Sequence, residues 1–289
     1  MAQHTAPPAP PAPSERLSRP ALVFWAIAGV AVVLAVVVGL ATLGGSPAKG
    51  PAATAAAEAN HGGPEAAAAA PVGELPVSTT YTTVDAAPQD ERPGSGTGGL
   101  VVHPVRETPV HDAPGGRPFA RMESTQIGDT WLPVIAEEGD WVQVLLPSKP
   151  NGSTGWLRSG DLERARSPSV VAVHLGSKRL ELTRDGQVVD EWTVGIGKAS
   201  APTPTGRTFL LGAFSDDAQD YSPVILPLGT HSPTLDTFGG GPGTVAIHTW
   251  PTDDVFGTAS SDGCIRVPSD ALDQLSGVPL GTLVMIDED

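Results

Sequence analysis

The hydrophobic and polar positions divide most of the chain into four stretches with different patterns. Residues 21–43 form one apolar run without a charge, residues 44–98 have almost no large apolar side chains, and residues 99–164 and 169–287 carry short alternating apolar runs. Alternation with a period of two predicts half-buried β-strands, whereas a long apolar run predicts a helix that is apolar on all sides. We therefore expect a mainly β protein with one N-terminal helix.

The apolar run 21–43 is long enough for a transmembrane helix, because its 23 residues would span about 34 Å, close to the thickness of a hydrocarbon core. Arg16 and Arg19 precede the run, so the positive-inside rule places the disordered tail 1–20 in the cytoplasm. A cleaved signal peptide is the alternative, but its apolar region is usually only ~7–15 residues. We expect an uncleaved single-pass anchor in the cell membrane, with the later domains extracytoplasmic.

Residues 44–98 are rich in Ala, Gly, Pro, Ser and Thr. A segment of this composition cannot bury enough apolar area to offset the conformational entropy that it loses on folding. We therefore expect a flexible, partly extended stalk between the membrane helix and the first β-rich region.

Residues 99–164 alternate short apolar runs with turn signals. Examples of such runs are 131–135 and 141–146, and Pro-Gly, Glu-Gly-Asp and Asn-Gly clusters separate them. Short strands with turns at this spacing favour a small β-barrel. The stretch from Ala113 to Leu157 resembles bacterial SH3-like domains, which implies that the strand Gly155-Trp156-Leu157 closes the barrel.

Three tryptophans of this region, Trp131, Trp141 and Trp156, have two interpretations. We favour packing in the core and at the barrel rim, because buried aromatic rings contribute a large apolar area. The alternative is a groove that binds a glycan or a peptide.

The second β-rich region covers residues 169–287. Strand patterns and their boundaries are found at 170–173, 179–183, 187–194 and 282–286, with a hairpin turn at Asp185-Gly186 and a short helix at 269–275. These signals predict a β-dominated domain with little helix.

The reactive residue types gather between residues 245 and 267. A strand run ends at His248, and the chain's single cysteine, Cys264, follows sixteen residues later, after a polar loop. A free thiol has a pKa of ~8.5 and is mostly protonated at neutral pH, so it needs a base or a cation to become a nucleophile. Gly263 lets backbone N–H groups approach a substrate oxygen closely. The combination suits acyl transfer through a thioester.

These motifs resemble the catalytic domain of YkuD-type L,D-transpeptidases, which are bacterial cell-wall enzymes. The family pattern is a His, a polar loop, then Ser/Thr-His-Gly-Cys followed by an apolar residue and Arg or Asn. Upstream, a Gly-rich strand end leads to a Thr-Pro-x-Gly block. The matching segments here are Gly195-Ile196-Gly197, Thr203-Pro204-Thr205-Gly206, His248 and Ser261-Asp262-Gly263-Cys264-Ile265-Arg266.

The resemblance covers about 120 residues and implies a β-sandwich-like fold and a role for each matching residue. It implies that Cys264 is the nucleophile, that His248 is the general base, and that the Thr249 carbonyl orients the imidazole. The amides of Gly263 and Cys264 would form the oxyanion hole. Arg266 would have a structural role or bind a substrate carboxylate.

Two residues depart from the family pattern: Asp262 stands where a His is usual, and Thr249 stands where a Gly is usual. An ionised Asp262 would oppose thiolate formation if it faced the sulfur. It would instead stabilise the turn if it accepted backbone N–H bonds, which Asp often does. We favour the turn role, and then expect Asp262→Asn to keep acylation within a few fold.

Four side chains are candidates for the substrate pocket: Ser261, Asp262, Arg266 and His231. His231 stands in a Gly/Pro-rich loop, where a solvated histidine is the simpler interpretation. The other histidines and the Asp-Asp pairs lack the spacing of metal ligands. We therefore expect no metal site, and the reaction that the resemblance implies needs no metal or organic cofactor.

The charge balance, 17 Lys+Arg against 32 Asp+Glu for a net charge of −15, argues against a nucleic-acid partner. The resemblance implies peptidoglycan stem peptides as partners, with Cys264 releasing a terminal D-Ala before a neighbouring amine or water takes the acyl group. A catalytically weakened wall-binding protein and a carboxypeptidase-like hydrolase remain alternatives. The sequence does not indicate an oligomeric state.

Overall fold

The computed structural model of the protein describes residues 71–238 and 240–289. The predicted tail 1–20, the predicted membrane helix 21–43 and the stalk as far as residue 70 lie outside the described residues. Among the residues that are described, no helix has the length and apolar character needed to cross a membrane.

The described chain is mainly β, as predicted. Helical structure consists of α1 (Ser269–Ser276) and three short 3₁₀ turns, η1 (Val72–Glu74), η2 (Ser159–Asp161) and η3 (Asp253–Val255). The strands of the first β-rich region are β1 (Leu100–Pro104), β2 (Thr108–His111), β3 (Pro118–Met122), β4 (Thr125–Gln126), β5 (Gly128–Asp129), β6 (Leu132–Glu138), β7 (Trp141–Leu145), β8 (Thr154–Arg158) and β9 (Leu162–Arg166). The strands of the second region are β10 (Ser169–His174), β11 (Arg179–Arg184), β12 (Gln187–Thr193), β13 (Ile196–Gly197), β14 (Gly206–Phe209), β15 (Leu226–His231), β16 (Thr244–His248), β17 (Ala259–Ser261), β18 (Ile265–Arg266) and β19 (Leu283–Asp287).

The first β-rich region is built around one sheet with the strand order β3-β2-β8-β7-β6-β1-β9, in which the paired neighbours are antiparallel. The alternation in Trp141–Leu145 turns Val142 and Val144 into the core, as the pattern predicts. Strand β8 carries Gly155-Trp156-Leu157 and lies between β2 and β7, inside the sheet. The SH3-like assignment stays a prediction.

The three tryptophans of this region are half-buried. Trp131 lies 5.2 Å from the ring of His103, and Trp141 lies 4.9 Å from the ring of His111, measured between ring centroids. All three tryptophans are therefore partly exposed to solvent.

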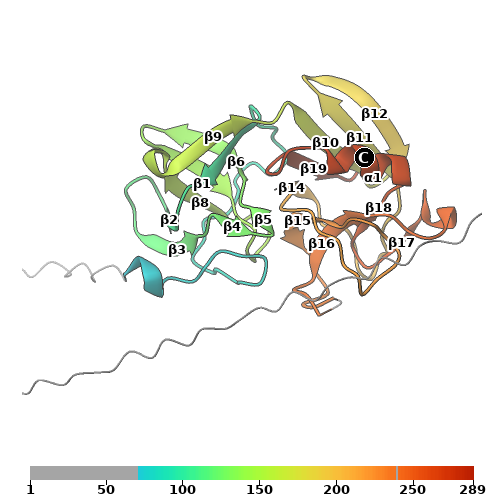
Figure 1. The fold of residues 1–289 in the computed structure, drawn as a ribbon, viewed down its shortest axis with the longest axis horizontal. Helices are drawn as coiled ribbons and strands as arrows, with labels where there is room; N and C mark the ends of the chain where they lie inside the picture. Colours follow the sequence, from blue (N-terminus) through green and yellow to red (C-terminus); the bar gives the residue numbers. More distant parts are fainter. Residues whose placement is uncertain (1–70, 239) are drawn as a thin grey trace, which may run out of the picture. The chain divides into compact units, whose positions relative to one another are not determined.

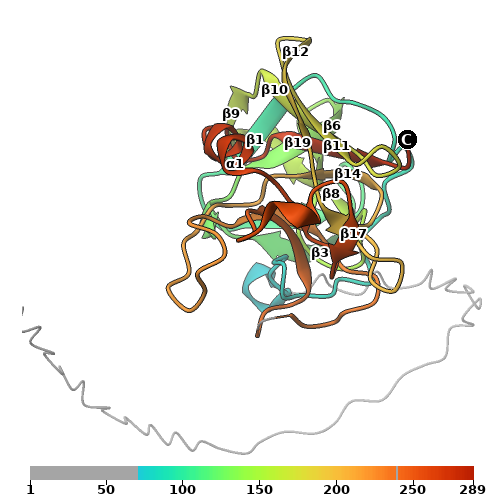
Figure 2. The same ribbon diagram turned by 90° about the vertical axis from the view of Figure 1, so that its right-hand side faces the viewer.

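The second region contains a five-stranded sheet, β12-β11-β10-β19-β14, whose strands are labelled in Figure 2. It also contains a three-stranded sheet, β15-β16-β18, whose strands are labelled in Figure 1. Residues of both sheets and of α1 share one hydrophobic core, including Val171, Ile247 and Leu272. The small sheet thus packs one of its faces into this core.

The two regions lie side by side (Figure 1) and share a second hydrophobic core. Phe209, Leu211 and Leu283 of the second region belong to the same buried cluster as Leu132 and Val134 of the first. Contacts of this kind join the two regions, because separating them would expose these side chains to water.

Residues 71–98 differ from the prediction of a flexible stalk. This segment, called the strap below, forms isolated β-bridges through Val77, Thr83 and Gln89, and buries Val84 and Ala87 in the shared core. Its composition misled the prediction because a few well-placed apolar side chains and backbone hydrogen bonds hold it. Backbone pairing requires little of the side chains involved.

A buried ion pair attaches the far end of the strap to β14. Arg207 Nε and Nη2 donate to the two carboxylate oxygens of Asp90 at 2.6 and 2.7 Å, and Arg207 Nη1 donates to the Ser95 carbonyl at 2.9 Å. Both side chains are only 3% exposed. Burial pushes the pKa of Asp90 upward, but hydrogen bonds from Arg207 and Arg92 outweigh it, so this pKa lies below its usual value.

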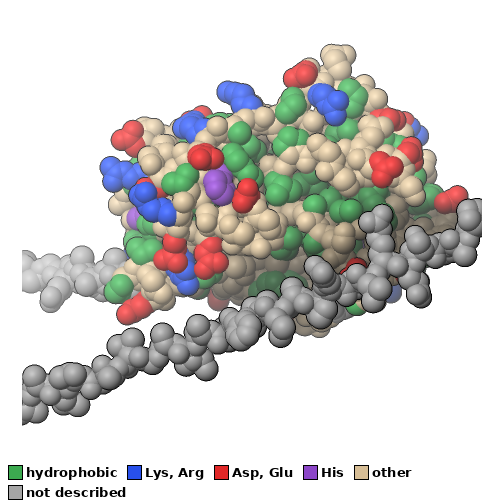
Figure 3. Space-filling model, viewed as in Figure 1, with side chains coloured by type: hydrophobic (Ala, Val, Ile, Leu, Met, Phe, Trp, Pro, Cys, Tyr) green, Lys and Arg blue, Asp and Glu red, His purple; other side chains and the backbone are tan. Residues whose placement is uncertain are grey.

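Charged side chains are spread over the face shown in Figure 3, with acidic and basic groups interspersed. Elsewhere in the first region Arg106 pairs with Asp161, and Arg164 pairs with Glu137. Exposed pairs of this kind contribute little to stability, so the shared core and the buried Asp90–Arg207 pair matter more for holding the regions together.

Candidate active site

Parallel pairing between β16 and β18 brings the predicted nucleophile and base together. Ile247 pairs with Ile265, and both side chains are buried in the core. Because side chains alternate along a strand, His248 and Cys264 belong to the opposite face of the same small sheet. Both residues line the same two cavities.

His248 is buried and held by its neighbour. Its Nδ1 lies 2.7 Å from the Thr249 carbonyl oxygen, and because a carbonyl only accepts, Nδ1 carries the proton and Nε2 keeps its lone pair. The Thr249 amide donates to Ser222 Oγ at 3.0 Å, and its hydroxyl donates to the Tyr221 carbonyl at 2.8 Å. Thr249 therefore lies where the resemblance implied, with its own side chain anchored.

Burial keeps both reactive groups neutral at rest. It raises the pKa of the Cys264 thiol, to which the charge of Asp262 adds, while a backbone hydrogen bond with Ala246 and the charge of Arg266 act in the other direction. Burial also lowers the pKa of His248. The hydrogen bond to Thr249 raises this pKa, and the charge of Arg266 lowers it further. A neutral imidazole beside a neutral thiol is suited to general-base activation rather than to a preformed ion pair.

The loop before Cys264 is held by hydroxyl groups. Gly263 has a φ of +114°, a conformation that favours glycine. Its carbonyl accepts from Thr203 Oγ1 at 2.8 Å, and the same hydroxyl accepts the Gly197 amide at 2.9 Å. Ser261 Oγ donates to the Cys264 carbonyl at 2.6 Å and accepts the Gly263 amide at 3.2 Å. The Gly263 amide must leave Ser261 before it can bind an oxyanion.

The turn role favoured for Asp262 is wrong. Among the described residues no backbone N–H donates to its carboxylate. In this turn it is Ser261 Oγ that accepts a backbone N–H, from Gly263. Asp262 Oδ1 lies 2.5 Å from Lys198 Nζ, and both side chains are partly exposed. Of the two, only Asp262 lines the first cavity. Lys198 therefore offsets the negative charge that Asp262 places near the thiol.

Arg266 lies on the cavity side of the sheet, where its guanidinium carbon is 3.8 Å from the ring centroid of Trp250. The Tyr221 ring is 4.9 Å from the His248 ring and 5.5 Å from the Trp250 ring. The sequence interpretation missed Tyr221 and Trp250. Trp250 could have been predicted, because it stands only two residues after His248. Tyr221 could not, because it belongs to a separate loop earlier in the sequence.

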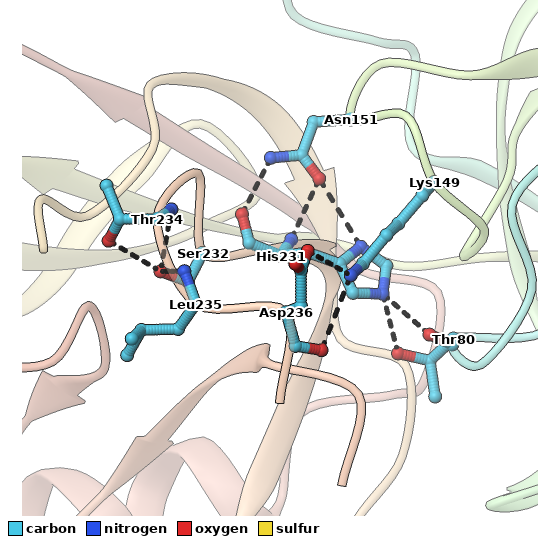
Figure 4. Close-up of polar contacts among 8 residues, drawn as sticks. All are labelled: Thr80, Lys149, Asn151, His231, Ser232, Thr234, Leu235 and Asp236. Carbon is cyan, nitrogen blue, oxygen red and sulfur yellow. Dashed lines mark hydrogen bonds and ion pairs between the residues drawn. The ribbon is translucent and has the colours of Figure 1, made fainter. Parts of the chain in front are cut away.

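His231 is not a solvated loop residue, and it lines neither of the two cavities at the thiol. It ends β15 and is only 2% exposed. Asn151 Oδ1 accepts its amide at 2.8 Å, Asn151 Nδ2 donates to its carbonyl at 2.7 Å, and its Nε2 lies 2.8 Å from the Thr80 carbonyl (Figure 4). Burial lowers its pKa, and the charge of Lys149 adds to this. His231 thus joins the strap, the first β-rich region and the second.

Two cavities meet at the reactive pair. The first has a volume of about 160 Å³ and is lined by Ser261, Asp262 and Arg266 among others. The second has a volume of about 330 Å³ and is mostly aromatic and aliphatic, with Asp216 on its wall. No group of three or more potential metal ligands occurs in the part of the chain that the structure describes.

The second region is similar to known proteins. Residues 168–286 match the family model of the YkuD L,D-transpeptidase catalytic domain. The Bacillus subtilis protein YkuD, which carries the name of an L,D-transpeptidase, is 27% identical over 167 residues, covering 55% of this chain and 94% of its own.

Solved structures of several bacterial proteins are also similar. An L,D-transpeptidase from Mycobacterium smegmatis is 13% identical, with 54% of this chain and 99% of that chain covered at a TM-score of 0.34. Bd1075 of Bdellovibrio bacteriovorus is 26% identical, with 42% and 48% covered at a TM-score of 0.34. The family match confirms the resemblance for the catalytic domain and supports a transpeptidase enzyme that acts in cell-wall cross-linking.

Proposed function

We propose that the protein is a peptidoglycan L,D-transpeptidase that uses Cys264 as its nucleophile and His248 as its base. One observation carries the proposal: the register between β16 and β18 puts the thiol and the imidazole on one sheet face, where both border the same two cavities. The family match over residues 168–286 supplies the class of reaction.

The first half-reaction forms a thioester. Because Thr249 holds Nδ1–H, His248 takes the thiol proton at Nε2, and Cys264 Sγ attacks the carbonyl carbon at the L-to-D junction of a stem tetrapeptide. The carbon–nitrogen bond then breaks, the proton passes from His248 to the departing amine, and D-Ala leaves. Donors around the Cys264 loop, including the Gly263 amide once released from Ser261, stabilise the oxyanion.

The second half-reaction transfers the acyl group. The amine of a neighbouring stem attacks the thioester carbon, His248 accepts the amine proton, and the sulfur leaves and recovers a proton from His248. Two cavities that reach one thiol suit a reaction with two peptide substrates. The anchor at residues 21–43 would place this chemistry on the cell-wall side of the membrane.

Intact-mass measurement of the full-length chain with imipenem tests the nucleophile, because thiols open β-lactam rings. We expect one adduct with the mass of imipenem, absent in Cys264→Ala. An adduct that persists in Cys264→Ala, or none in the unaltered chain, would refute the assignment.

Product analysis with a stem tetrapeptide separates the alternatives. With an amine-bearing stem peptide added, a transpeptidase yields a cross-linked dimer, whereas a hydrolase yields only the shortened peptide and free D-Ala. A chain that binds wall fragments and forms neither product would be the weakened wall-binding protein.

A further inference from the structure

Exposed aromatic side chains gather around the second cavity. Tyr81, Phe214 and Phe238 are 73%, 39% and 52% exposed, and all three line this cavity together with Cys264 and His248. Large apolar side chains that remain in water at the mouth of a cavity mark a binding surface more often than a packing defect.

The strap supplies Tyr81 in a defined position. Tyr81 lies in a tight turn in which Thr82 N donates to the Thr79 carbonyl at 3.1 Å and the Tyr81 amide donates to Thr79 Oγ1 at 3.1 Å. The preceding residue, Thr80, is buried. Its hydroxyl contacts Thr244 and lies 3.0 Å from His231 Nε2.

The contacts that hold Thr80 therefore also fix part of the wall of the second cavity. Thr244 is on β16, the strand that ends at His248, and Thr80, Tyr81 and Thr244 all line the second cavity. A segment far from the catalytic domain in sequence thus forms part of the surface that a substrate meets beside the thiol.

The chemistry of the walls indicates the kind of group that this cavity takes. Among the described residues that line it there is no lysine or arginine, and Asp216 is the one carboxylate. Aromatic faces and a carboxylate attract an ammonium group, through the ring quadrupole and through charge. The first cavity differs, because it contains Arg266 as well as Asp262.

We propose that Tyr81 of the strap is a specificity-determining residue that contacts the amine-bearing substrate segment in the second cavity. The inference rests on the proposed function, since it assigns one substrate of that reaction to a place beside Cys264. It also gives the strap a role in recognition besides its role in packing.

The test uses the full-length chain and two stem peptides. The donor is a tetrapeptide L-Ala-γ-D-Glu-L-Lys-D-Ala with an acetylated side-chain amine, and the acceptor is the tripeptide L-Ala-γ-D-Glu-L-Lys with a free one. At saturating donor, Tyr81→Ala should raise the KM for the acceptor by about fivefold or more, the factor expected when a cation–aromatic contact is lost. Tyr81→Phe, which keeps the ring, and Asp85→Ala, which alters an exposed strap residue outside the cavity, should stay within about twofold.

The rate of imipenem acylation separates recognition from structural damage. It should stay within about twofold in Tyr81→Ala, because acylation of Cys264 precedes the step that uses the acceptor amine. An unchanged acceptor KM, or a parallel fall in imipenem acylation, would overturn the inference while leaving the transpeptidase intact. Absence of D-Ala release by the unaltered chain would instead refute the proposed function, and the inference with it.

Discussion

His231 and His248 stand at opposite ends of the β15–β16 pair, and burial lowers the pKa of both. They differ in what surrounds the rings. Among the described residues, the His248 ring has a hydrogen bond only at Nδ1 and borders two cavities, whereas both nitrogens of His231 face acceptors on Thr80 and Asn151. Burial and a lowered pKa therefore do not distinguish the two histidines. The ring nitrogen that His248 leaves available at the cavities is what favours it as the proposed base.

Replacing each histidine by alanine tests this contrast most strongly. His248→Ala should slow imipenem acylation by about 100-fold or more, as expected for loss of a general base. His231→Ala should keep acylation within several fold and lower the free energy of unfolding by about 1–3 kcal/mol, because the Thr80 carbonyl and Asn151 Oδ1 lose the ring nitrogens that face them. Stopped-flow acylation and denaturant titration measure the two effects. Equal losses of acylation would show that the contrast is wrong.

Removing Asp90 tests whether the strap is part of the folded unit. Asp90→Ala leaves the buried Arg207 without its partner, so the free energy of unfolding should fall by about 3–5 kcal/mol. The exposed control Asp85→Ala should change it by less than about 0.5 kcal/mol. Since the folded pKa of Asp90 is lowered, its contribution is present above the unfolded pKa and disappears as the pH falls through the folded value. A loss in Asp90→Ala no larger than in Asp85→Ala would favour a free stalk.

The smallest expected effect concerns Lys198 and Asp262. The negative charge of Asp262 raises the pKa of Cys264, so Asp262→Asn should move the alkaline inflection of the acylation rate to lower pH. Lys198→Ala leaves Asp262 unpaired and should move it to higher pH, with a loss of a few fold at pH 7. The acid limb should lie below the usual histidine pKa in all these variants, because burial lowers that of His248. Shifts of the alkaline limb in the reverse sense would exclude this electrostatic role.

The sequence predicted that His248 and Cys264 would lie together, from the strand runs beside them and from the family resemblance. The register between β16 and β18 places both residues on one sheet face. Tyr221 and Lys198 were not predicted, because they reach the site only through tertiary packing of separate loops.

The errors have the same origin. Asp262 is of a residue type that is common in turns, but its carboxylate pairs with Lys198, which is distant in sequence. His231 lies among glycine and proline in the sequence, but Asn151, eighty residues earlier, accepts a hydrogen bond from its backbone amide. The strap lacks a hydrophobic period, so only its long-range bonds reveal that it is folded.

Phe209, Leu211 and Leu283 bury their side chains against the neighbouring β-rich region and not only within their own. A gene segment cut at residue 168, where the family match begins, would encode a domain with an exposed hydrophobic surface. Such a piece would be poorly suited to recombination as an independent module. Substitutions in the core shared by the two regions are then expected to be compensated by substitutions on the opposite side of that core.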